Sequence, residues 1–172
     1  MRYGGAVLPM RARVADVSQR GRLTWIGVRP AHGAPMVVLA EAAAIADRGL
    51  DGDRTAAGAG GGRRQVTLVQ GEHLPVVAGF VGVAAIDPTQ VRRNLVVTGI
   101  NLAALHGLRV AIGDEVIVVP TGPCAPCRKL DALIGPGGFQ AMRGHGGVTA
   151  RIERGGRLRL GDVVHVLGVA GP

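Results

Sequence analysis

Apolar residues alternate with polar ones, or cluster as β-branched residues, in nine short segments of the chain. A period of two is the pattern of a β-strand with one buried face. It predicts strands near residues 12–17, 23–28, 36–39, 64–69, 95–98, 108–112, 115–119, 148–152 and 163–167. So many short strands within 172 residues are typical of a barrel or a sandwich.

Helical spacing is weaker and is confined to a few places. It predicts helices within residues 71–80 and 127–142, and Asp87 followed by Pro88 predicts a helical turn. The Ala-rich residues 41–48 favour a helix by propensity but lie between predicted strands, so their structure stays open. Gly-Asp pairs at 113–114 and 161–162 precede Val-rich segments and predict two hairpin turns. We therefore expect a mainly β, barrel-like fold with a few short helices.

Composition supports a folded chain with many turns and an aliphatic core. Apolar residues make up 47% of the chain and charged residues 19%, which excludes global disorder. The 29 glycines and 10 prolines follow no fixed period, and aromatic residues make up only 2% by the same count. The Gly-rich residues 56–62 lie between predicted strands and predict a mobile loop rather than a linker. We expect one domain over residues 1–172.

The formal net charge of +8 indicates an anionic partner. Proteins that bind single-stranded nucleic acid stack bases on aromatic side chains, and the few scattered aromatic residues offer no such platform. A phosphorylated small molecule fits the charge better than nucleic acid does. Residues 1–10 carry too short an apolar piece for a signal peptide, and no apolar run reaches the roughly 18 residues of a membrane helix. The expected location is the cytoplasm, without a membrane partner.

The segment TGPCAPCRKL, residues 121–130, is the sharpest local feature and follows a predicted strand. It places Cys124 and Cys127 three residues apart, and Arg128 and Lys129 follow directly. Neighbouring cations favour the thiolate, which attacks electrophiles, carries sulfur or binds a soft metal. Two inert buried thiols are the plainest alternative. A zinc site would need two further ligands from scattered histidines, and a thioredoxin-like dithiol would need a βαβ unit.

Two further segments carry candidate binding residues. Arg92 and Arg93 precede a predicted strand, where side chains alternate, so one guanidinium would face a cleft and its neighbour would brace it. Guanidinium groups suit phosphate oxygens, and the amide of Asn94 suits a ring rich in amide groups, such as a pterin. Asp53 and Arg54 lie at the exit of a tight loop that two glycines allow. A solvated basic strand end and an ordinary turn are the alternatives.

His145 lies between glycines, which would let it approach a ligand closely, although an exposed loop histidine is the simpler interpretation. The chain has no Ser-His-Asp order, no phosphate-binding Gly-x-x-x-x-Gly-Lys-Ser/Thr run and no His-Glu-x-x-His stretch. Hydrolase and nucleotidase functions therefore lose their best support.

Several motifs, taken in order, resemble the MOSC domain, which occurs at the C-terminus of molybdenum cofactor sulfurases and as small free-standing bacterial proteins. They are RGLDGDR (48–54), RQVTL (64–68), RRNLVVTGINL (92–102), GPCAPC (122–127) and a C-terminal GD (161–162). Each motif is weak by itself, but their order and spacing match over about residues 14–166. The resemblance implies a barrel-like fold and binding of the molybdenum cofactor, a phosphorylated pterin dithiolene. It places the family cysteine at Cys127, which would ligate molybdenum or carry sulfur.

Together, the residues and the resemblance predict that several segments converge on one basic cleft. The predicted cofactor-binding residues are Asp53, Arg54, Arg92, Arg93, Asn94, Cys124, Arg128 and Lys129. Guanidinium forks would bind the phosphate and a thiolate would bind the metal.

The leading functional hypothesis is a cofactor-binding protein that reduces N-hydroxylated compounds. A carrier that holds persulfide sulfur on Cys127 is the second, and a basic binding module with inert cysteines is the third. The larger relatives attach a pyridoxal-phosphate desulfurase or a further N-terminal β portion, for which this chain has no room. The expected partners are therefore a separate cysteine desulfurase or an electron-donor protein.

Overall fold

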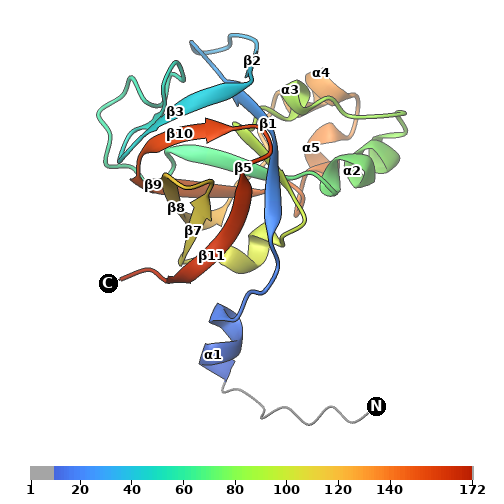
Figure 1. Ribbon diagram of the computed structural model, residues 1–172. Helices are drawn as coiled ribbons and strands as arrows, with labels where there is room; N and C mark the ends of the chain where they lie inside the picture. Colours follow the sequence, from blue (N-terminus) through green and yellow to red (C-terminus); the bar gives the residue numbers. More distant parts are fainter. Residues whose placement is uncertain (1–9, 172) are drawn as a thin grey trace, which may run out of the picture.

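The computed structural model describes residues 10–171 and is mainly β, as predicted. Seven strands close into a barrel in the order β11-β7-β8-β9-β5-β6-β1, and β1 pairs with β11 to complete the ring (Figure 1). They are β1 (Gly21–Val28), β5 (Val66–Gln70), β6 (Leu95–Thr98), β7 (Leu108–Ile112), β8 (Val116–Pro123), β9 (Val148–Arg154) and β11 (Val163–Val169). The β5–β6 pair is parallel, and the other barrel pairs are antiparallel. The short strand β2 (Val37–Leu39) extends the sheet by pairing with the C-terminal end of β1.

A second sheet of three strands lies against the barrel, in the order β10 (Gly156–Arg159), β3 (Glu41–Ile45) and β4 (Gly49–Leu50) (Figure 1). The Ala-rich segment whose structure the sequence left open is therefore mostly the strand β3. Alternate alanines, Ala42 and Ala44, are buried in the barrel core, while their neighbours are exposed. Pairing with β10 and β4 outweighs the helical propensity of alanine here.

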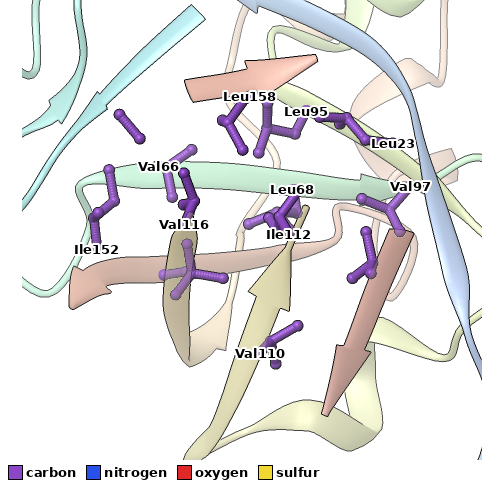
Figure 2. Packing of buried hydrophobic residues seen from close by; sticks show 14 of the residues in the cluster. Leu23, Val66, Leu68, Leu95, Val97, Val110, Ile112, Val116, Ile152 and Leu158 are labelled. Atoms are coloured by element: carbon purple, nitrogen blue, oxygen red, sulfur yellow. The ribbon is translucent and has the colours of Figure 1, made fainter. Parts of the chain in front are cut away.

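The barrel core is aliphatic, as the scarcity of aromatic residues predicts. Leu23, Leu68, Val97 and Ile112 are among the side chains that meet inside the barrel (Figure 2). Burying one such side chain contributes about 1.5–3 kcal/mol relative to leaving it exposed.

A second apolar cluster joins the outer surface of β5 and β6 to four short helices. These are α2 (His73–Val81), α3 (Pro88–Val91), α4 (Leu130–Ile134) and α5 (Gly138–Ala141), which gather on one side of the barrel (Figure 1). The predicted helical turn is α3: Asp87 caps it, and Gln90 completes a capping box. A 3-10 turn, η1 (Leu102–Leu105), precedes β7.

Two expectations about local structure are wrong. Residues 12–17 do not form a strand: α1 (Met10–Ala15) is a helix that extends away from the barrel (Figure 1). It lies next to no sheet edge, so its backbone bonds locally, with Asp16 N–H donating to the Ala12 carbonyl. Residues 113–114 do join β7 to β8 as a hairpin, but residues 161–162 connect β10 to β11 across the two sheets.

No helix within residues 10–171 is long and apolar enough to cross a membrane. The expectation that the N-terminus lacks an export signal falls on residues 1–9, outside the described part of the chain.

Candidate functional site

The ends of several elements meet at a cavity of about 410 Å³ on the flank of the barrel. It lies where β1 ends, where α3 runs into β6, and where the chain passes from β8 to α4. Seven of its eleven lining residues are cations: Arg29, Arg54, Arg64, Arg92, Arg93, Arg128 and Lys129. The other four are His32, Gly33, Thr55 and Cys127, so none of the lining residues is acidic. Such a cavity attracts anions strongly.

Cys127 is the thiol that lines this cavity. It is half-buried and packs partly against the second apolar cluster. Cys124 is only 2% exposed and lies outside the lining. Lys129, two residues after Cys127, places its Nζ 3.6 Å from the position that a Cβ on Gly33 would occupy. Residues 121–130, here called the cysteine segment, therefore reach across to the turn that follows β1.

Arg93 holds the cysteine segment in place from beneath. Its guanidinium donates to the carbonyls of Cys124 (3.2 Å), Ala125 (3.1 Å), Gly146 (2.7 Å) and Val91 (3.1 Å). The side chain is 2% exposed, and this burial is the main cause that lowers the pKa of Arg93 from its ordinary value. Guanidinium remains protonated in proteins, so a fixed positive charge lies at the base of the cavity.

Two glycines of the segment around His145 pack directly on this arrangement. A Cβ on Gly146 would collide with the Cys124 carbonyl, and one on Gly147 would collide with the Leu68 carbonyl. The Gly147 carbonyl also accepts a hydrogen bond from Cys124 N–H at 2.8 Å. These two glycines thus allow close packing of residues 146–147 against the cysteine segment and against β5. His145 itself lies outside the cavity lining and contacts His73 edge-on, with ring centroids 4.8 Å apart.

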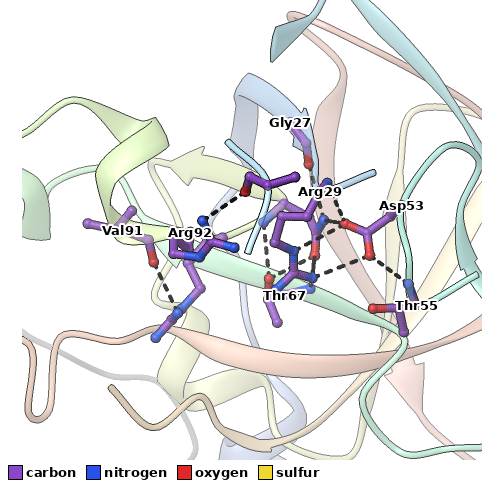
Figure 3. A network of polar contacts seen from close by, with 10 residues as sticks. Gly27, Arg29, Asp53, Thr55, Thr67, Val91 and Arg92 are labelled. Atoms are coloured by element: carbon purple, nitrogen blue, oxygen red, sulfur yellow. Dashed lines mark hydrogen bonds and ion pairs between the residues drawn. The ribbon is translucent and has the colours of Figure 1, made fainter. Parts of the chain in front are cut away.

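Behind the cavity wall, Asp53 pairs with Arg29 in a buried network (Figure 3). The Asp53 carboxylate accepts bonds from Arg29 Nε (3.2 Å) and from the backbone N–H groups of Arg29 and Thr55, both at 2.9 Å. Burial raises the pKa of Asp53, but these hydrogen bonds and the charge of Arg29 outweigh it and bring the pKa below the usual 3.8. Asp53 therefore remains ionised and holds Arg29 at the cavity.

Asn94 completes the network and has no polar atom left for a ligand. Its Nδ2 donates to Asp53 (2.9 Å) and to the Gly27 carbonyl (3.1 Å). Its Oδ1 accepts from the Thr67 hydroxyl (2.8 Å) and from Arg29 (3.3 Å). Asn94 is 1% exposed, so it fixes the ends of β1, β5 and β6 relative to one another.

The structure brings six of the predicted residues to the cavity lining: Arg54, Arg92, Arg93, Cys127, Arg128 and Lys129. Asp53, Asn94 and Cys124 lie behind the wall, where they touch lining residues or their backbone. Any contribution they make to binding is therefore indirect in this conformation.

The expected alternation of Arg92 and Arg93 along a strand is not observed. Arg92 is the left-handed residue (φ 58°) that ends α3, so both side chains reach the cavity. The sequence assigned no binding role to Arg29, Gly33 or Thr55. His32 was one of the scattered histidines of the alternative zinc site, and Arg64 entered only as the first residue of the motif RQVTL. The position of Arg29 directly after the predicted strand 23–28 is the signal that was available.

The structure is that of a β-barrel protein with an anion-attracting cavity and one cysteine at its lining. Comparison with known proteins gives its family. The sequence model of the MOSC domain matches residues 53–165, which is more than half of the chain. The chain therefore belongs to the MOSC domain family. No curated protein matches its sequence.

Solved structures show the same fold. The YuaD protein from Bacillus subtilis superposes with a TM-score of 0.71 at 19% identity, over 88% of this chain and 97% of that one. YiiM from Escherichia coli gives 0.62 at 19% identity, over 88% and 72%. YiiM from Geobacillus stearothermophilus gives 0.66 at 17% identity, over 86% and 75%.

The donor set of the cavity suits a metal that arrives with its own ligands. Within residues 10–171, no group of three or more His, Cys, Asp or Glu side chains is placed to hold a metal ion. The protein offers one cysteine sulfur at the lining, surrounded by cations. A soft metal already held by a phosphorylated dithiolene fits this combination, because it needs one more soft ligand and a partner for its phosphate.

Proposed function

We propose that this chain binds the molybdenum cofactor in the cationic cavity, with Cys127 as the protein ligand of the metal, and that the loaded site reduces N-hydroxylated compounds. MOSC domains as a family are associated with this cofactor. The observation that carries the proposal is the placement of one thiol, Cys127, in a cavity lined by seven cations and no carboxylate.

Each part of the site has a distinct task in this proposal. Arg93 fixes the segment that carries Cys127, so the thiolate is held in one place without a cost for ordering it during binding. Asp53 and Asn94 fix Arg29, whose guanidinium lines the cavity with other cations that can bind the cofactor phosphate.

The bound cofactor would supply two-electron redox chemistry. Reduction of an N-hydroxylated compound breaks the N–O bond, consumes two electrons and two protons, and releases water. The electrons come from a separate electron-transfer protein, or from a chemical reductant in an assay, and the protons come from solvent.

The test uses protein produced in a host with intact cofactor synthesis. The wild type and Cys124→Ala are expected to retain molybdenum and pterin, whereas Cys127→Ala loses at least about tenfold, because only Cys127 lines the cavity. Cys124→Ala is the matched control, since it also removes a thiol from the same segment. Reduction of benzamidoxime by reduced methyl viologen then reports the reaction.

Equal molybdenum in Cys127→Ala and the wild type would refute the assignment of the ligand. Sulfane sulfur bound to Cys127 without molybdenum would support the carrier role in place of the reductase.

A further inference from the structure

The cavity holds more positive charge than the proposed cofactor needs. Among its seven cations, Arg29 is offset by Asp53. A phosphate monoester carries about two negative charges near neutral pH, and a thiolate at Cys127 carries one. About three cations then remain without a counter-charge in the loaded site.

Four exposed cations of the lining, here called the mouth of the cavity, have no protein partner among the residues that the structure describes. Arg54, Arg64, Arg128 and Lys129 are exposed. Their side chains form no hydrogen bond or ion pair with any residue in the range 10–171, whereas those of Arg29, Arg92 and Arg93 do. None of the lining residues is acidic, so no carboxylate of the cavity wall balances these charges. Mutual repulsion of unpaired cations is unfavourable until an anion joins them.

The size of the cavity limits what that anion can be. A volume of about 410 Å³ lies near the lower end of the range for a single drug-sized ligand. A cofactor that fills most of this space leaves room only for a small second group, and Arg128 and Lys129 are exposed lining residues that could bind it. Arg128 and Lys129 directly follow Cys127, and Lys129 reaches over the turn at Gly33.

We propose that the substrate is a small N-hydroxylated compound that carries an anionic group of its own, and that Arg128 and Lys129 bind this group beside the reacting centre. The inference rests on the proposed function and names its substrate class. A carboxylate bound there would place the rest of a small molecule close to the Cys127 end of the cavity.

Two amidoximes that differ by one charge test this proposal. Benzamidoxime is neutral, and 4-carboxybenzamidoxime adds a carboxylate. With reduced methyl viologen as reductant and rates normalised to molybdenum content, we expect kcat/KM to favour the carboxylate by about tenfold, the gain typical of one charge-assisted hydrogen bond. Salt at 0.5 M should reduce this preference, because the mouth is open to solvent.

Variants then assign the preference to residues. Lys129→Gln and Arg128→Gln should each bring the ratio of the two kcat/KM values several-fold closer to one. Arg20→Gln is the matched control: Arg20 is exposed, has no described side-chain partner, and precedes β1 at the end opposite Arg29. Those two positions are nine residues apart on an extended strand, at most about 30 Å, so the control removes the same charge far from the cavity.

A binding measurement gives a readout that does not depend on turnover. Calorimetric titration of the protein with 4-carboxybenzamide and with benzamide, neither of which has an N–O bond to reduce, should show tighter binding of the carboxylate. Lys129→Gln should reduce the difference several-fold, and Arg20→Gln should keep it.

The outcomes separate the two proposals. If both amidoximes are reduced with equal kcat/KM, the function stands and the anionic substrate is wrong. If neither is reduced but the carboxylate still binds more tightly through Lys129, the substrate-anion site stands and the reductase function is wrong. Loss of molybdenum from Lys129→Gln to the level of Cys127→Ala would assign this cation to the cofactor and overturn the inference.

Discussion

Asp53 lies outside the cavity lining, yet it determines how one of the cavity cations is held. Its carboxylate is 1% exposed and the Arg29 side chain 8%, so the pair lies almost entirely out of water. Both oxygens of Asp53 accept hydrogen bonds, and the bond to Asn94 ties the pair to the barrel. Removing one member of such a pair leaves the other charge buried without compensation.

Asp53→Asn should therefore lower the free energy of unfolding by about 3 kcal/mol or more at neutral pH. Urea denaturation measures the loss. Glu41→Gln is the control, because Glu41 pairs with Arg157 at 3.1 Å on the surface, with both side chains more than half exposed. An exposed pair is worth at most about 1 kcal/mol. Similar losses in the two variants would show that the Arg29 pair is not the buried support described here.

At the scale of elements, the position of Cys127 depends on packing between the cysteine segment and residues 143–147. Gly146 lies against the Cys124 carbonyl, and its own carbonyl oxygen accepts a hydrogen bond from Arg93 Nε. The two segments are therefore held together by one guanidinium and by a close backbone approach that only glycine permits.

Gly146→Ala should destabilise the protein by about 1–3 kcal/mol, because its new methyl group overlaps a backbone carbonyl that Arg93 holds in place. Molybdenum content should fall with it. Gly79→Ala serves as the comparison, since Gly79 lies in α2 with no atom within 4 Å of an added Cβ. That substitution should stabilise the helix by about 0.5–1 kcal/mol. A Gly146→Ala protein with unchanged stability and full cofactor content would contradict the packing argument.

For the whole molecule, several titrating groups act in the same direction. Burial and the nearby His145 lower the pKa of His73 from 6.5. Burial raises the pKa of Glu72, but hydrogen bonds, chiefly from Gly99 N–H, bring it below 4.5. Bonds from the Thr89 hydroxyl and N–H lower the pKa of Asp87 below 3.8, as the network lowers that of Asp53. In every case the unfolded chain binds the proton more readily than the folded chain does.

Stability should therefore decrease as the pH falls, first below about 6.5 through His73, then below about 4.5 and 3.8 through the carboxylates. Chemical denaturation between pH 7 and pH 3 measures this dependence. His73→Gln should flatten the part between pH 6.5 and 5, and His106→Gln, on an exposed residue, should leave it in place. A stability that is constant from pH 7 to 5 would show that His73 has the same pKa in the folded and unfolded chain.

Much of the barrel follows from local pattern. Eight of the nine predicted strands form, because alternation with a period of two is a property of each segment alone and already sorts its side chains into buried and exposed sets. The exception, residues 12–17, shows the limit: the segment alternates as a strand would, but no sheet edge lies beside it, and residues 10–15 form the helix α1. Likewise, β3 is a strand because β10 and β4 flank it, which no local propensity reports.

The sequence by itself determined the fold class and the functional groups available to the site. These groups are a thiol followed by two cations, and arginines in separate motifs. Only the tertiary structure decided which of these groups meet. Arg29 bonds to Asp53 across 24 positions of the chain, and Arg93 bonds to Cys124 across 31. Such contacts depend on how strands distant in sequence close the barrel, and on backbone conformations such as the left-handed Arg92 that no side-chain pattern encodes. Separating the residues that line the cavity from those that support its wall therefore required the three-dimensional fold.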